Sequence, residues 1–177
     1  MTKKNNTHRM VEGAVIAALY VVLTYSQELL LPGTTSMAIQ FRLSEILCIL
    51  CIFTPSAIWG LTIGTLISNL LSVGVLPMDI IIGTFATFVA ASTAYLFRNV
   101  RIFSLPILSA LMPVLANGIL IGLELELFLI DGPFHFSSFL LQGGMVAIGE
   151  FGVCIILGLP FFKLLQKFNI EKALQSK

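Results

Sequence analysis

Hydrophobic residues along this chain are grouped into six long runs that are separated by short polar stretches. A hydrocarbon core about 30 Å thick requires about 20 helical residues to cross it, and most of the runs approach or exceed that length. They extend over about residues 10–31, 38–53, 55–74, 78–97, 103–129 and 137–165. The pattern predicts one all-α membrane domain over residues 1–177, built from six transmembrane helices.

The second run needs a further argument, because its strictly apolar part covers only residues 43–53 and such a length is also typical of an interfacial segment. Cytoplasmic flanks of membrane proteins collect Lys and Arg. Here the basic clusters lie before the first run, between the fourth and fifth, and at or after the end of the sixth: Lys3, Lys4, Arg9, Arg98, Arg101, Lys163, Lys167, Lys172 and Lys177. An even number of crossings must separate these clusters, so the second run has to cross, and both termini are expected in the cytoplasm. Arg42 is the exception to this distribution.

The composition agrees with a multi-pass protein of the cell membrane, since 57% of the residues are hydrophobic, 11% are charged and the mean hydropathy is +0.99. Nothing in it favours nucleic-acid binding. The cysteines Cys48, Cys51 and Cys154 lie in apolar runs and are interpreted as small buried hydrophobic residues. The sequence contains no phosphate-loop, zinc-protease or nucleophile-elbow motif. We therefore expect no enzyme activity, metal or cofactor in this chain, and any energy should come from a partner.

The acidic residues concentrate at the end of the bundle opposite the basic clusters. An ionisable residue within a span usually faces a cavity or a partner, so it marks a candidate functional site. Asn117 and Glu124 are seven residues apart and share a helix face, while Glu150 is the deepest acid in the expected topology. We expect these residues to converge on one outward-facing pocket. Glu126 is rotated by about 200° from Glu124 and is expected to meet lipid headgroups.

Simpler interpretations of these residues remain open. Arg42 and Glu45 are three residues apart and also fit a pair that caps a helix at the membrane surface. Asp79 can cap the fourth helix, and Glu150 can link helices through hydrogen bonds without binding a ligand. Ala14 and Ala18 form a small-xxx-small face that suits either a partner helix or packing within the bundle.

Five segments together resemble the substrate-binding S component of an energy-coupling factor (ECF) transporter, and specifically the QueT queuosine-precursor family. They are "AVIAALYVVLT", "IQFRLSEIL", "FTPSAIWGLTIGTLISNLLS", "DIIIGTFATFVAA" and "IGEFGVCIILGLP". The resemblance implies an S-component-like six-helix bundle that works with a transmembrane coupling subunit and two ATPase subunits. It also implies that Ala14 and Ala18 contact the coupling subunit, and that residues 32–40 form a loop that closes over the ligand.

The family's substrates imply a 7-deazaguanine such as preQ1 or queuine. One carboxylate can accept both the ring N1–H and the exocyclic amine, while the ring carbonyl needs a donor. We rank Glu150 and Glu45 first for the ring, and Asp79 is a candidate for the cationic arm. The candidate substrate-binding residues are Gln40, Arg42, Glu45, Asn69, Asp79, Asn117, Glu124 and Glu150.

Three other functions remain open. One is an S component for a different vitamin-like ring compound such as thiamine, because the candidate pocket residues constrain the charge of the ligand better than its shape. Another is an autonomous carrier that uses Glu150 and Asp79 as proton sites. The last is a membrane scaffold without a ligand.

Overall fold

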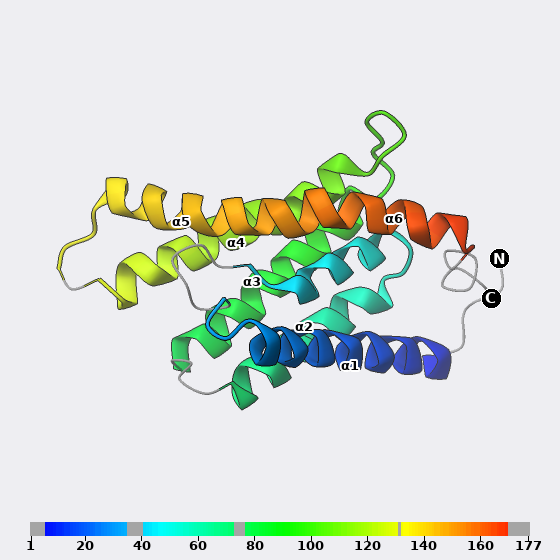
Figure 1. The fold of residues 1–177 in the computed structure, drawn as a ribbon, viewed down its shortest axis with the longest axis horizontal. Helices are drawn as coiled ribbons and strands as arrows, with labels where there is room; N and C mark the ends of the chain where they lie inside the picture. Colours follow the sequence, from blue (N-terminus) through cyan, green and yellow to red (C-terminus); the bar gives the residue numbers. More distant parts are fainter. Residues whose placement is uncertain (1–5, 35–40, 73–76, 131, 170–177) are drawn as a thin grey trace.

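The structure, a computed structural model, describes residues 6–34, 41–72, 77–130 and 132–169 (Figure 1). Within these residues the fold is all-helical, as predicted, apart from one isolated β-bridge between Ile102 and Leu105. The helices are α1 (Asn6–Leu30), η1 (Leu43–Ile52), α2 (Ser56–Leu71), α3 (Pro77–Leu96), α4 (Ile107–Phe128), α5 (Phe136–Phe151), η2 (Gly152–Leu157) and α6 (Gly158–Lys167). The short η1 is a 3₁₀ helix and η2 is a π-helix.

Among the residues that the structure describes, four helical segments are long and apolar enough to cross a membrane. They are Asn6–Leu30, Pro77–Leu96, Ile107–Phe128 and Phe136–Lys167, the last of which joins α5, η2 and α6. Each corresponds to one of the runs identified in the sequence. The remaining two runs form shorter apolar helices, Leu43–Ile52 and Ser56–Leu71. At about 2.0 Å per residue in a 3₁₀ helix and 1.5 Å in an α-helix, these extend over only about 20 and 24 Å.

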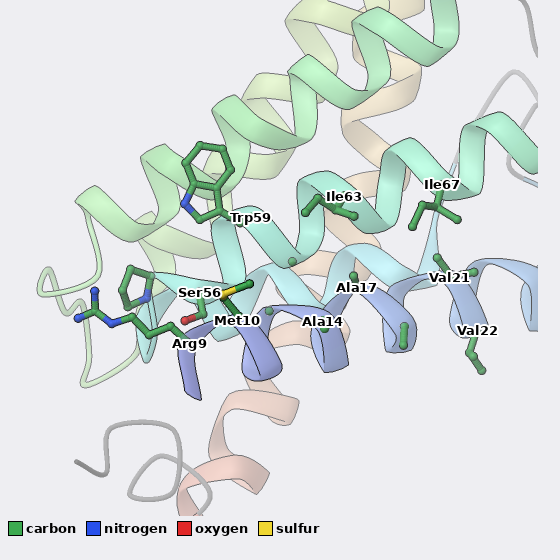
Figure 2. A pocket seen from close by; sticks show the side chains of 14 residues that line it. Arg9, Met10, Ala14, Ala17, Val21, Val22, Ser56, Trp59, Ile63 and Ile67 are labelled. Carbon is green, nitrogen blue, oxygen red and sulfur yellow. The ribbon is translucent and has the colours of Figure 1, made fainter. Parts of the chain in front are cut away.

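Small residues bring α1 and α2 into close contact. A Cβ atom on Gly60 would lie 2.6 Å from the carbonyl oxygen of Gly13, and one on Gly64 would lie 2.8 Å from the Cβ of Tyr20. Gly60 and Gly64 therefore pack against α1 of the same chain. Ala14 and Ala18 are exposed and line a groove between α1 and α2 (Figure 2).

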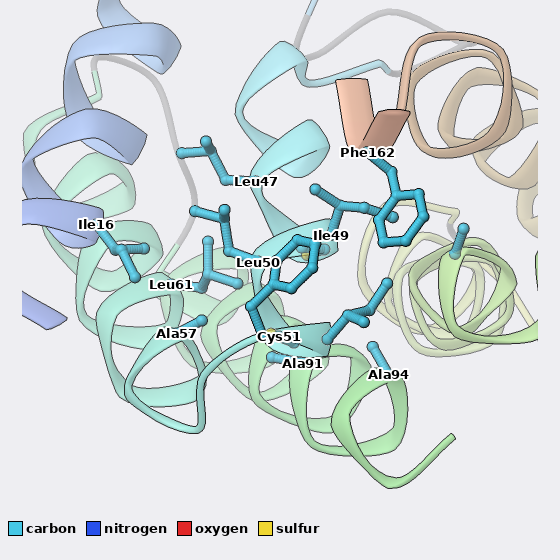
Figure 3. Packing of buried hydrophobic residues seen from close by; sticks show 14 of the residues in the cluster. Ile16, Leu47, Ile49, Leu50, Cys51, Ala57, Leu61, Ala91, Ala94 and Phe162 are labelled. Atoms are coloured by element: carbon cyan, nitrogen blue, oxygen red, sulfur yellow. The ribbon is translucent and has the colours of Figure 1, made fainter. Parts of the chain in front are cut away.

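The core is built around η1. All seven residues from Leu47 to Phe53 are buried, so consecutive side chains meet protein on every side of this helix (Figure 3). Its neighbours are α1, α2, α3, α4, α6 and η2. The ring of Phe53, just after η1, stacks on Phe162 of α6 with 5.5 Å between the ring centroids. The 38–53 run was predicted to form an ordinary membrane helix, whereas its described part is a central 3₁₀ helix covered by other helices.

The two ends of the described chain lie at the same end of the bundle, where α1 begins and α6 finishes (Figure 1). The turn between α3 and α4 reaches this end too, because the guanidinium of Arg101 lies 5.4 Å from the ring centroid of Phe162. The basic residues Arg9, Arg98, Arg101, Lys163 and Lys167 belong to these segments. The charge asymmetry that was read from the sequence therefore corresponds to one end of the folded bundle.

Candidate substrate-binding site

Polar side chains from six helices and from Arg42, the residue that precedes η1, gather inside the bundle. We define the polar cluster as Tyr20, Arg42, Glu45, Asn69, Asp79, Asn117, Glu124 and Glu150, which the following contacts connect. Three of its carboxyl groups are almost fully buried: Glu45 is 1%, Glu150 3% and Glu124 4% exposed. Arg42 and Asp79 are partly buried. Buried charged groups are costly unless they are paired or meet a ligand, so this arrangement requires a specific explanation.

Glu45 is held in place by two donors. The hydroxyl of Tyr20 on α1 donates a hydrogen bond of 2.7 Å to Oε1, and the Cys48 thiol, one turn along η1, donates to Oε2 at 3.0 Å. These bonds fix the carboxylate in one orientation. Each oxygen can accept a further hydrogen bond, because a carboxylate has about four acceptor positions.

Arg42 interacts with several members of the polar cluster. Its Nη1 donates to Oδ1 of Asn69 at 3.3 Å, and the guanidinium interacts electrostatically with Glu45 and Glu150. Asn69 in turn donates from Nδ2 to the backbone oxygen of Asp79 at 3.1 Å. One chain of contacts thus runs from η1 through α2 to the first turn of α3.

Glu150 completes the cluster from α5. The side chain of Asn117 on α4 lies within hydrogen-bonding range of it, and the Cys154 thiol is 3.6 Å from its Oε2. The same thiol is 3.9 Å from the backbone oxygen of Glu45. Cys154 belongs to η2, which begins two residues after Glu150. Single π-helical turns inside α-helices are frequent at functional sites.

The structure brings together seven of the eight residues predicted to bind a substrate. Gln40, the eighth, lies outside the described residues. Tyr20 and the thiols of Cys48 and Cys154, which contact the carboxylates, were not predicted from the sequence. A signal for Tyr20 was present, because Tyr20, Thr24 and Gln27 follow helical spacing and are all buried on α1. Gln27 anchors the chain before η1 by donating to the oxygen of Phe41 and accepting from the nitrogen of Leu43, each at 2.7 Å.

The prediction that Glu126 meets lipid headgroups was wrong. Its side chain is buried, and Oε1 accepts a 2.8 Å hydrogen bond from the backbone nitrogen of His135 at the start of α5. The connection after α4 thus returns to cover this face. A carboxylate at this position also interacts favourably with the positive N-terminal end of α5.

A separate apolar groove runs between α1 and α2, with a volume of about 790 Å³ (Figure 2). Its lining includes Ala14, Ala18, Val22, Trp59, Ile63 and Ile67. Trp59, Ile63 and Ile67 are all exposed, and small residues, among them Gly13 and Gly60, also line the groove. Such a surface suits a membrane helix, because small residues allow close approach.

The family described as QueT transporter matches residues 10–167. The chain is 32% identical over 186 aligned residues to the queuosine precursor transporter QueT of Lactococcus lactis subsp. cremoris (strain MG1363), covering 96% of this chain and 99% of that protein. No solved structure matches it. With its four long apolar helices, the chain is a multi-pass membrane protein.

Proposed function

Because this chain belongs to the QueT transporter family, we propose that it is the substrate-binding subunit of an ECF importer that takes up a queuosine precursor. The ligand would be a 7-deazaguanine such as preQ1 or queuine. The observation that carries this proposal is the polar cluster, in which carboxylates and amide or guanidinium donors lie together inside an apolar bundle. Transport, and no chemical reaction, is the role of this chain.

The cluster offers the chemistry that the ring requires. A 7-deazaguanine presents N1–H and the exocyclic amine side by side, and Glu45 and Glu150 supply carboxylates that can accept both. The ring carbonyl needs a donor, which Arg42, Asn69 or Asn117 can provide. Hydrogen bonds of this kind are stronger in a buried site than in water. The bonds from Tyr20 and Cys48 to Glu45 support the proposal, since a pre-oriented acceptor needs less ordering when the ligand arrives.

For the topology we propose six crossings with both termini in the cytoplasm. The shortness of η1 does not oppose this, because a helix covered by other helices does not have to match the thickness of the lipid. The basic residues at the end where α1 begins and α6 finishes support a cytoplasmic position for that end.

The proposed mechanism is capture of the ligand from outside, followed by ATP-driven reorientation within a complex. The chain has no phosphate-loop motif, so ATP would be hydrolysed by two ATPase subunits. A transmembrane coupling subunit would pack into the α1–α2 groove, which Ala14 and Ala18 line. The exposure of both alanines supports this position over packing within the bundle.

The function and the docking surface can be tested by one uptake experiment. We expect proteoliposomes that contain this chain and its coupling module to accumulate preQ1 only with ATP. Ala14→Leu and Ala18→Leu should lower uptake by at least about tenfold, because a larger side chain in a close helix contact costs about 1–3 kcal/mol, while preQ1 binding by the isolated subunit is unchanged. Val15→Leu is the matched control, since Val15 is exposed on α1 but does not line the groove.

Three results would contradict parts of this proposal. Full uptake by both alanine variants would remove the groove as the docking surface. Uptake that continues without the ATPase subunits would favour an autonomous carrier. Uptake of thiamine in place of preQ1 would keep the S-component function and change the substrate.

A further inference from the structure

The proposed ring contacts use the carboxylates of Glu45 and Glu150. The other two carboxyl groups of the polar cluster, those of Asp79 and Glu124, have no role in them. Asp79 lies in the first turn of α3 and Glu124 lies on α4. Their carboxyl groups approach within hydrogen-bonding range of each other. Glu124 is 4% exposed, yet its Oε1 has no hydrogen-bond partner within the described part of the chain. A buried oxygen without a partner is uncommon in folded proteins, and this one can accept a hydrogen bond from a ligand.

The charges of the cluster point to the nature of that group. By its definition above, the cluster contains four carboxyl groups, those of Glu45, Asp79, Glu124 and Glu150, and one basic side chain, that of Arg42. Two ionised carboxylates in contact repel each other, because both are negative and neither has a proton to donate to the other. A proton or a cation between them makes the contact favourable. The arrangement therefore suits a ligand that brings a positive charge with N–H donors.

The pair is connected to the proposed ring site. Asn69 accepts from Arg42 through Oδ1 and donates through Nδ2 to the backbone oxygen of Asp79. Arg42 also interacts electrostatically with Glu124. The close approach of α2 and α3 fixes this geometry, since a Cβ on Gly83 would lie 2.9 Å from Nδ2 of Asn69. A ligand whose ring contacts Arg42 could thus reach the pair with a short substituent.

From these contacts we propose that Asp79 and Glu124 form a subsite for a protonated amine on the 7-substituent, so that the protein selects amine-bearing 7-deazaguanines over those with a neutral 7-substituent. This inference rests on the proposed function, because it takes the 7-deazaguanine ring as given. The amine donates to Oε1 of Glu124 and to the Asp79 carboxylate, replacing the repulsive contact with charge-assisted hydrogen bonds. A nitrile at the same position can only accept hydrogen bonds and cannot donate to either carboxyl group.

The test compares two ligands that share the ring, preQ1 with its aminomethyl group and 7-cyano-7-deazaguanine, by calorimetric titration of the purified chain. We expect wild type to bind preQ1 at least about tenfold more tightly, the usual size of one charge-assisted hydrogen bond. Asp79→Asn and Glu124→Gln should each weaken preQ1 binding by about tenfold and change binding of the cyano compound by less than about twofold. Glu126→Gln is the matched control on α4 and should leave both affinities unchanged.

Each other outcome has a distinct meaning. Equal binding of the two ligands by wild type would overturn the amine subsite and leave the proposed function intact. Equal weakening of both ligands by the variants would also overturn it, because the pair would then only maintain the fold. Binding of neither ligand by folded wild type would refute the proposed function, and the subsite with it.

Discussion

Replacing Glu45 with alanine is expected to weaken preQ1 binding by about 2–3 kcal/mol, which corresponds to about 30- to 150-fold in Kd. Glu45 is the most buried carboxylate of the polar cluster and is oriented by Tyr20 and Cys48. Its removal takes away an acceptor for the ring and leaves the Tyr20 hydroxyl without this partner. The measurement is calorimetric titration of the purified variant with preQ1.

Two controls separate lost recognition from lost folding. Tyr20→Phe removes only the hydroxyl that orients Glu45, and should weaken binding by about 1 kcal/mol, the net value of an ordinary hydrogen bond. Thermal unfolding in detergent should show that both variants remain folded at the temperature of the titration. If the folded Glu45→Ala protein binds preQ1 as tightly as wild type does, Glu45 does not bind the ring.

Gly143→Ala is expected to destabilise the protein by about 3 kcal/mol, at the upper end of the usual cost of overpacking. A Cβ on Gly143 would collide with the carbonyl oxygen of Gly118, and Gly143 Cα lies 2.5 Å from where a Cβ on Gly122 would be. The obstacle is backbone on both sides, so no flexible side chain can move away. The effect should appear as a lower midpoint of thermal unfolding in detergent.

The neighbouring glycine provides the matched control. A Cβ on Gly144 would meet nothing within 4 Å in the described structure, so Gly144→Ala should keep or raise the midpoint, because alanine favours a helix by about 0.5–1 kcal/mol over glycine. Equal midpoints for Gly143→Ala and Gly144→Ala would show that α4 and α5 do not approach this closely. Gly143 and Glu150 are seven residues apart on α5, so the same contact also places Glu150 against Asn117.

Hydrophobic run length predicted the long helices well. The runs at 78–97 and 137–165 correspond to Pro77–Leu96 and Phe136–Lys167. The 103–129 run began too early, because Phe103 and Ser104 adopt positive φ in a tight turn before α4. Run length could not identify η1 as a central 3₁₀ helix, because burial on all sides depends on helices that are distant in sequence.

Helical phase predicted the shared face of Asn117 and Glu124, and its failures have a physical cause. Asn69, Asn117 and Glu150 are buried together because each stands on the inward face of its helix. Helical phase predicted that Glu126 meets the headgroups, because phase describes only the rotation of residues around one helix. It cannot show that the connection after α4 returns and covers Glu126. The Cys154 contact with Glu45 joins residues 109 positions apart. A contact of that range depends on tertiary packing and cannot be read from spacing.

The central claim is that this chain captures a 7-deazaguanine in its buried polar cluster. The most direct test is calorimetric titration of the detergent-purified protein, stripped of bound ligand, with preQ1, queuine, guanine and thiamine in parallel. We predict tight binding of preQ1 or queuine and much weaker binding of guanine, which lacks the 7-substituent. Binding of thiamine alone, or of none of the four by demonstrably folded protein, would contradict the claim.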